Sequence, residues 1–90
     1  MYSIVFTKKA EKELDKLPAK IADQIADEIE MLATEPRPHG YKKLSDFRIP
    51  NAPSDLYRIQ IGDYRVVYSI EDTVLTIQIF RVKHRSKVYE

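Results

Sequence analysis

The spacing of the apolar residues changes partway along the chain, and this change limits the folds available to it. From Ala10 to Leu32 the apolar residues recur every three or four positions, which is the spacing of amphipathic helices. Thr7 can cap the first helix, and Pro18 separates it from a second, because proline ends one helix and suits the first turn of the next. Residues 7–34 are therefore predicted to form a helical hairpin with one buried face.

From Leu56 onward the apolar residues instead alternate with polar ones, as in strands that have one buried face. Three such strands are predicted, at 56–61, 64–70 and 73–82. The pairs Gly62-Asp63 and Glu71-Asp72 that join them are short enough for antiparallel hairpins. The chain also opens on a short β-rich run, YSIVF, which we interpret as a further strand.

Less regular sequence joins these two regions. Residues 35–40 contain two prolines and a glycine and are predicted to be a turn or loop. Residues 41–44 are either a short strand or a loop edge, and residues 45–55 are irregular. We expect an α+β fold of order β-α-α-β-β-β, in which the helical hairpin packs on one face of a mostly antiparallel four-stranded sheet.

Composition narrows the class of protein. Ninety residues suffice for one domain, spanning 1–90. The absence of cysteine excludes a disulfide framework, and two distant histidines without an acid cluster make no metal site; His39 is interpreted as a loop residue. No apolar run approaches the roughly 20 residues of a membrane helix, and the N-terminus lacks the layout of a secretion signal. We therefore expect a cytoplasmic protein without membrane association, metal or cofactor.

The net charge of +1 hides an asymmetry between the two halves of the chain. Residues 1–36 contain five Lys and Arg against eight Asp and Glu, whereas residues 37–90 contain ten against six. The segment RVKHRSK, residues 81–87, contains no acid. Opposite signs in the two halves favour a basic functional surface on a neutral-to-acidic scaffold, although a solvated tail would show the same composition.

Alternation also assigns the charged residues to one face of the sheet. If the helices cover the apolar rows, the uncovered face carries Arg58, Gln60, Arg65 and Gln78, together with an exposed Phe80. The basic segment 81–87 begins at the edge of this face. Guanidinium groups beside an aromatic ring suit a polyanion with bases to stack, which favours single-stranded RNA. The alternative is that these arginines are only solvated.

Four stretches carry a resemblance to a known family: YSIVFTKKAEKELDKLP, MLATEPRPHGYKKL, LYRIQIGDYRVVYSI and VKHRSKVY. The most specific parts are GDYRVVY and the H-R-x-x-x-Y pattern from His84 to Tyr89. On these residues the chain resembles the RelE/ParE toxin superfamily over essentially its whole length, and the RelE-like branch in particular. The resemblance implies a RelE-like, microbial-RNase-like fold and the role of toxin in a type II toxin–antitoxin system.

The RelE-like branch further implies an enzyme, an mRNA interferase. Such a ribosome-dependent endoribonuclease enters the ribosomal A site and promotes attack of a ribose 2′-hydroxyl on the adjacent phosphate, without a metal, and so inhibits translation. The implied partners are the ribosome, messenger RNA and a cognate RelB-like antitoxin. The antitoxin would hold the toxin in a hetero-oligomer that can bind operator DNA through the antitoxin.

The resemblance assigns catalytic roles to five residues of this chain. Arg65 matches the arginine that stabilises the scissile phosphate, and Arg85 matches a second phosphate-binding arginine. Tyr89 matches a tyrosine that stacks on the substrate base or assists proton transfer. Arg58 stands where the family often has a lysine, and His84 matches a histidine found in many relatives. Because arginine, with a pKa above about 12, is a poor proton carrier at neutral pH, His84 and Tyr89 are the candidate proton carriers.

Seven further residues are expected to bind RNA: Lys42, Lys43, Gln60, Phe80, Arg81, Lys83 and Lys87. Gln60 is a departure, because this position is basic in the best-studied members of the family. One branch uses a carboxylate near the position of Lys42 as a base, and this chain has none there. The shortage of an evident base indicates that catalysis relies on orientation and electrostatics, with the ribosome aligning the 2′-hydroxyl.

Two other functions fit the same fold. A ParE-like toxin would inhibit DNA gyrase and catalyse nothing, but ParE-like members lack the combination that Arg65, Arg85 and Tyr89 provide here. A decayed homologue would only bind an antitoxin or nucleic acid. Cuts confined to A-site codons would favour the nuclease, and an effect on supercoiling with intact mRNA would favour the gyrase inhibitor.

Overall fold

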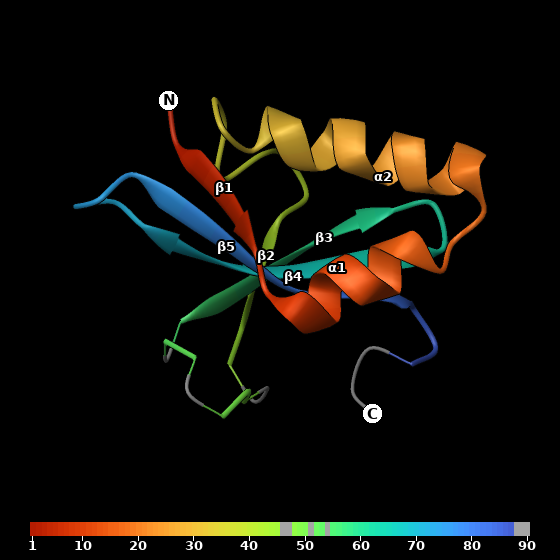
Figure 1. Ribbon diagram of the computed structural model, residues 1–90. Coiled ribbons are helices and arrows are strands. Elements are labelled where there is room, and N and C mark those ends of the chain that lie inside the picture. Colours follow the sequence, from red (N-terminus) through yellow and green to blue (C-terminus); the bar gives the residue numbers. More distant parts are fainter. Residues whose placement is uncertain (46–47, 51, 54, 88–90) are drawn as a thin grey trace.

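The computed structural model describes residues 1–45, 48–50, 52–53 and 55–87 (Figure 1). In chain order its helices and strands are β1 (Ser3–Phe6), α1 (Lys8–Asp15), α2 (Ala19–Met31), β2 (Lys42–Leu44), β3 (Leu56–Ile61), β4 (Tyr64–Glu71) and β5 (Thr76–His84). The helical hairpin and the alternating strands therefore form where the apolar spacing predicts them. Within the described residues, no helix is long and apolar enough to cross a membrane.

The strands form one sheet in the order β1-β5-β4-β3-β2. β1 is parallel to β5, and all other neighbours are antiparallel. The predicted α+β class is confirmed, but the sheet has five strands rather than four, because Lys42–Leu44 pairs with the start of β3 as an edge strand. β5 begins at Thr76 rather than at Thr73, because residues 72–75 form a turn in which Leu75 adopts a left-handed φ of 47°.

Both helices pack on the same face of the sheet. α1 begins where expected, because the Oγ1 of Thr7 accepts a hydrogen bond from the backbone amide of Ala10 at 3.1 Å. One buried cluster fills the space between the helices and strands β3, β4 and β5: Ala10, Ile25, Ile29, Leu32, Ile59, Ile61, Val66, Tyr68, Ile77, Ile79 and Val82. We call this side of the sheet the helix side.

The opposite side of the sheet carries a second, smaller cluster. Its buried members are Leu44, Leu56, Val67 and Phe80, and two side chains of the segment between β2 and β3, Ile49 and Ala52, pack against them. The side that was predicted to be uncovered is therefore partly covered by a loop.

The burial of Phe80 corrects the sequence interpretation. Phe80 is only 7% exposed, so the expectation of an exposed ring for base stacking is wrong. The ring lies on the side that alternation assigned, but the other residues of the second cluster cover it there, together with Ile49 and Ala52 of the segment between β2 and β3. Phe80 is also the extra residue of a β-bulge between β4 and β5, where Val67 pairs with Arg81 and Tyr68 pairs with Ile79.

Polar contacts fix the loop that follows α2 against the sheet. The hydroxyl of the buried Tyr68 donates to the carbonyl oxygen of Pro36 at 2.8 Å, and burial raises the pKa of this phenol. The carboxylate of Asp72, in the turn between β4 and β5, accepts hydrogen bonds from Arg37 at 3.0 Å and from the hydroxyl of Tyr2. These two donors lower the pKa of Asp72.

Candidate nucleic-acid interface

The strand register brings three polar side chains into one row on the side opposite the helices. Gln60 on β3 is the direct partner of Arg65 on β4, and Arg65 is the direct partner of Lys83 on β5. Directly opposed residues of antiparallel strands project from the same face, with their Cβ atoms about 5 Å apart. Arg65 therefore lies between a hydrogen-bonding amide and a second cation.

A second row lies two residues further along each strand. Lys42 on β2 pairs with Arg58 on β3, Arg58 pairs with Val67 on β4, and Val67 pairs with Arg81 on β5. Successive residues on one face of a strand are about 7 Å apart. The two rows thus gather Lys42, Arg58, Arg65, Arg81 and Lys83, with Gln60, on a surface that we call the cationic face.

Arg65 is the member of the cationic face with an unmet hydrogen-bonding need. Its side chain is partly buried, and its Nε is buried with no hydrogen-bond partner among the described residues. A buried donor without a partner costs about 1–3 kcal/mol. A phosphate oxygen would satisfy this donor with a charge-assisted hydrogen bond, so the geometry suits an anionic ligand.

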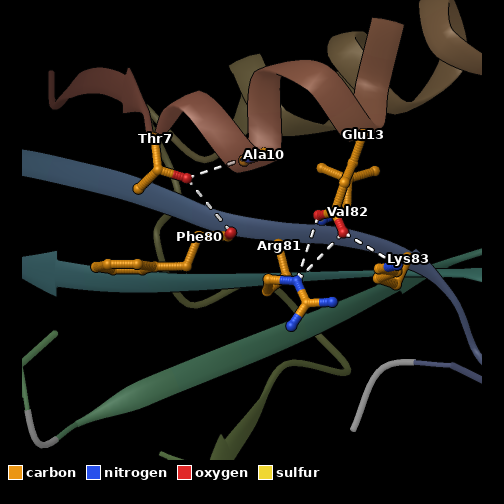
Figure 2. Close-up of polar contacts among 7 residues, drawn as sticks. All are labelled: Thr7, Ala10, Glu13, Phe80, Arg81, Val82 and Lys83. Carbon is orange, nitrogen blue, oxygen red and sulfur yellow. Dashed lines mark hydrogen bonds and ion pairs between the residues drawn. The ribbon is translucent and has the colours of Figure 1, made fainter. Parts of the chain in front are cut away.

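An acid from the helix side of the molecule holds the two β5 cations. The carboxylate of Glu13 on α1 lies 3.2 Å from the Nε of Arg81 and 3.4 Å from the Nζ of Lys83 (Figure 2). Arg81 is 7% exposed, which leaves it less accessible to RNA than the sequence interpretation assumed. Lys83 is more open, with 31% of its side chain exposed. The sequence interpretation missed Glu13.

The adjacent lysines of β2 point to opposite sides of the sheet. Lys42 is exposed and belongs to the cationic face, as expected. Lys43 pairs with Tyr57, which packs against the helix-side cluster, and its Nζ lies 3.4 Å from a carboxylate oxygen of Asp55. Lys43 is therefore not brought together with the other predicted RNA contacts.

His84 also lies apart from Arg65. It pairs with Tyr64 on the helix side, and the two rings meet edge to face with their centres 5.5 Å apart. The backbone amide of Ser86 donates to its Nδ1 at 3.3 Å, and the hydroxyl of Ser86 lies 3.0 Å from the same nitrogen. His84 lines a shallow groove with Tyr64 and with Lys16 of the α1–α2 connection.

The residues after β5 only partly join the cationic face. The amide of Arg85 donates to the carbonyl oxygen of Asp63 at 2.7 Å, and its Nε is 3.9 Å from the Asp63 carboxylate, which holds it at the turn between β3 and β4. The direct neighbour of Arg65 is thus Lys83 rather than Arg85. Lys87 is exposed beyond β5, and Tyr89 lies outside the described residues.

Elsewhere in the described part of the chain, no three His, Cys, Asp or Glu side chains lie close enough to hold a metal ion. His39 is exposed in the loop after α2, where it lines a cavity of about 360 Å³ between the end of α2 and β3. Gln60 also borders this cavity, and its Nε2 donates to the carbonyl oxygen of Gly62 at 3.1 Å.

Known proteins resemble this chain along nearly its full length. A family model described as the ParE toxin of the type II toxin–antitoxin system parDE matches residues 4–89. The toxin RelE of Mycobacterium tuberculosis is 30% identical over 89 residues, which cover 98% of this chain and 86% of that toxin.

Solved structures agree with this similarity. The RelE chain in the RelE–RelB complex from Pyrococcus horikoshii is 30% identical, with a TM-score of 0.77 over 97% of this chain and 98% of that one. A chain of the toxin–antitoxin complex RelBE2 from Mycobacterium tuberculosis is 33% identical, with a TM-score of 0.74 over 93% and 98%. The similarity therefore includes both the sequence and the arrangement of helices and strands.

Proposed function

The chain belongs to the RelE/ParE superfamily of type II toxin–antitoxin toxins, and from this premise we propose that it is a ribosome-dependent endoribonuclease that cleaves messenger RNA in the A site. The observation that supports the proposal most is the cationic face. Arg65, with an unpaired buried Nε, lies there between Gln60 and Lys83. Cleavage at this site would stop translation.

The proposed reaction is attack of a ribose 2′-hydroxyl on the adjacent phosphorus. The 2′-oxygen loses its proton and bonds to phosphorus, and the bond to the 5′-oxygen breaks, which leaves a 2′,3′-cyclic phosphate and a 5′-hydroxyl. Charge builds on the non-bridging oxygens of the pentacoordinate phosphorus, where fixed cations stabilise it most. We assign this role to Arg65 and Lys83, with Arg58 in the second row binding a neighbouring phosphate.

The proton carriers of this reaction remain His84 and Tyr89 in our proposal. His84 lies on the helix side, so it can exchange a proton with the reacting atoms only if the RNA passes around the end of β5. We therefore give electrostatic stabilisation and orientation the larger share of catalysis, with the ribosome aligning the 2′-hydroxyl. Naked RNA should be cleaved poorly.

Primer extension on mRNA from a cell-free translation reaction tests this function. The wild-type protein should produce cuts at A-site codons, and Arg65→Ala should slow cleavage by on the order of 100-fold, as expected for loss of one donor to a developing oxyanion. Lys43→Ala, which removes one charge from the helix side, is the matched control and should cleave normally. Efficient cleavage of RNA without ribosomes would contradict the dependence on the ribosome.

Inhibition of DNA gyrase is a second candidate function, because the matching family model describes a ParE toxin. In that case the protein inhibits DNA gyrase without catalysis. Supercoiling assays on the same preparation separate the two functions, since intact mRNA together with inhibited gyrase would contradict the nuclease.

We also propose that a RelB-like antitoxin binds this chain, because two similar toxins were solved in complexes with RelB antitoxins. An antitoxin for a cationic face should be acidic or place an amphipathic helix across it. The complex should bind operator DNA through the antitoxin. Expression of the toxin alone should arrest growth, and co-expression with the neighbouring antitoxin gene should restore it.

A further inference from the structure

Glu13 makes more polar contacts than any role in helix α1 requires. Its carboxylate accepts hydrogen bonds from the backbone amide of Val82 at 2.8 Å and from the Nε of Arg81 at 3.2 Å. It also lies 3.4 Å from the Nζ of Lys83, and only 12% of its side chain is exposed. Figure 2 shows this carboxylate reaching past the edge of β5 to all three donors.

The position of Glu13 follows from the way the sheet ends. β1 pairs with β5 only as far as Phe6 and Ile79, so the rest of the β5 edge has no neighbouring strand. α1 follows β1 directly and runs along this edge. There the carboxylate of Glu13 accepts the hydrogen bond from the amide of Val82, in place of a carbonyl oxygen on a neighbouring strand.

The same carboxylate restricts two long cationic side chains. A lysine ammonium on its flexible four-carbon chain loses up to about 2 kcal/mol of conformational freedom when it is fixed in one position. Glu13 supplies an ion pair that holds the Lys83 ammonium at the β5 edge, and Arg81 shares the same anion. Because Lys83 pairs directly with Arg65 across β4 and β5, this anchor sets where the second cation of the row lies.

We propose that Glu13 is a positioning residue for RNA cleavage: it fixes the ammonium of Lys83 at the β5 end of the row that contains Arg65, so that both cations meet the same phosphate. The inference rests on the proposed nuclease function and adds to it a residue outside the cationic face. Glu13 touches neither the substrate nor the reacting atoms, and acts through Lys83.

A purely electrostatic role of Glu13 and a positioning role predict different kinetics for the variant Glu13→Gln. Removing an acid beside a cationic face should tighten RNA binding, so a purely electrostatic role would leave kcat unchanged or raise it. Loss of positioning should instead lower kcat by on the order of 10- to 100-fold while KM stays the same or falls, because the lost interaction is needed in the transition state. The glutamine keeps an oxygen that can accept from the amide of Val82.

The experiment measures kcat and KM for cleavage of mRNA on programmed ribosomes. Glu11→Gln, an exposed position on the same helix, makes the same charge change and should match the wild type. Glu13→Asp keeps the charge but shortens the side chain, so it should also lower kcat; it serves as the test if Glu13→Gln does not fold. In a Lys83→Ala background, Glu13→Gln should lower kcat no further.

Each result decides the matter. Unchanged or increased kcat in both Glu13 variants overturns the inference, and so does an equal penalty of Glu13→Gln with and without Lys83. A wild-type protein that leaves mRNA intact on the ribosome overturns the proposed function, and the inference with it. Cleavage by the wild-type protein therefore shows whether the proposed function holds, independently of the results for the Glu13 variants.

Discussion

At the scale of single residues, Tyr68 illustrates how the core accepts a polar group. Its hydroxyl donates to the carbonyl oxygen of Pro36, and the raised pKa of the phenol keeps this donor protonated. Tyr68→Phe should lower the free energy of unfolding by about 1–3 kcal/mol, because the buried carbonyl loses its donor. Urea denaturation measures the loss. Tyr41→Phe, on a half-open ring, is the control, and equal stability of the two variants would contradict the role of the hydrogen bond.

Single residues also show where sequence reasoning succeeds. Arg58, Gln60 and Arg65 lie together on the side away from the helices, as alternation predicted, because β3 and β4 pair regularly from Tyr57 to Ile61. Glu13 could not be recognised in the same way. In the sequence it is one of eight acids in the first 36 residues, and only the packing of α1 against the β5 edge distinguishes it.

At the scale of elements, β5 departs from simple alternation after Phe80. Alternation carried through residues 77 and 79 would turn the following odd-numbered residues toward the helices. The bulge at Phe80 reverses this, so Val82 and His84 face the helix side while Arg81 and Lys83 join the cationic face. A bulge adds one residue without any signal in composition or periodicity. The fold class and the faces of Ile77, Ile79 and Phe80 were therefore predictable, and alternation could not predict the faces of the residues beyond the bulge.

Asp72 connects the β4–β5 turn to the loop after α2 and to the residue before β1, and these contacts make the stability of the fold depend on pH. Arg37 and Tyr2 lower the pKa of its carboxyl group, so these contacts stabilise the fold above the unfolded pKa of about 4 and are lost as the pH falls through the folded pKa. Asp72→Asn should reduce stability near neutral pH, and its difference from the wild type should shrink below about pH 4. Urea unfolding across this range tests it, with Asp23→Asn, on the exposed side of α2, as the control. A difference that grows in acid would refute the linkage.

At the scale of the whole molecule, the two adjacent lysines of β2 lie on opposite sides of the sheet, and this provides a direct test of which side binds RNA. Lys42→Ala should reduce the slope of log affinity against log salt by about 0.7 for a non-cleavable single-stranded RNA, as for loss of one phosphate contact. Lys43→Ala, on the helix side, should leave the slope unchanged. Fluorescence anisotropy over a range of salt concentrations measures both. Equal slopes for the two variants would exclude the cationic face as the RNA-binding side.

The parallel pairing of β1 with β5 has a consequence for how the protein is made. β1 pairs with residues 76–79, which are synthesised only after both helices and strands β2, β3 and β4. Contacts so distant in sequence form late, because most of the chain must be ordered before they close. A growing polypeptide therefore has no completed sheet before β5 has been synthesised, and β1 has no strand partner until then.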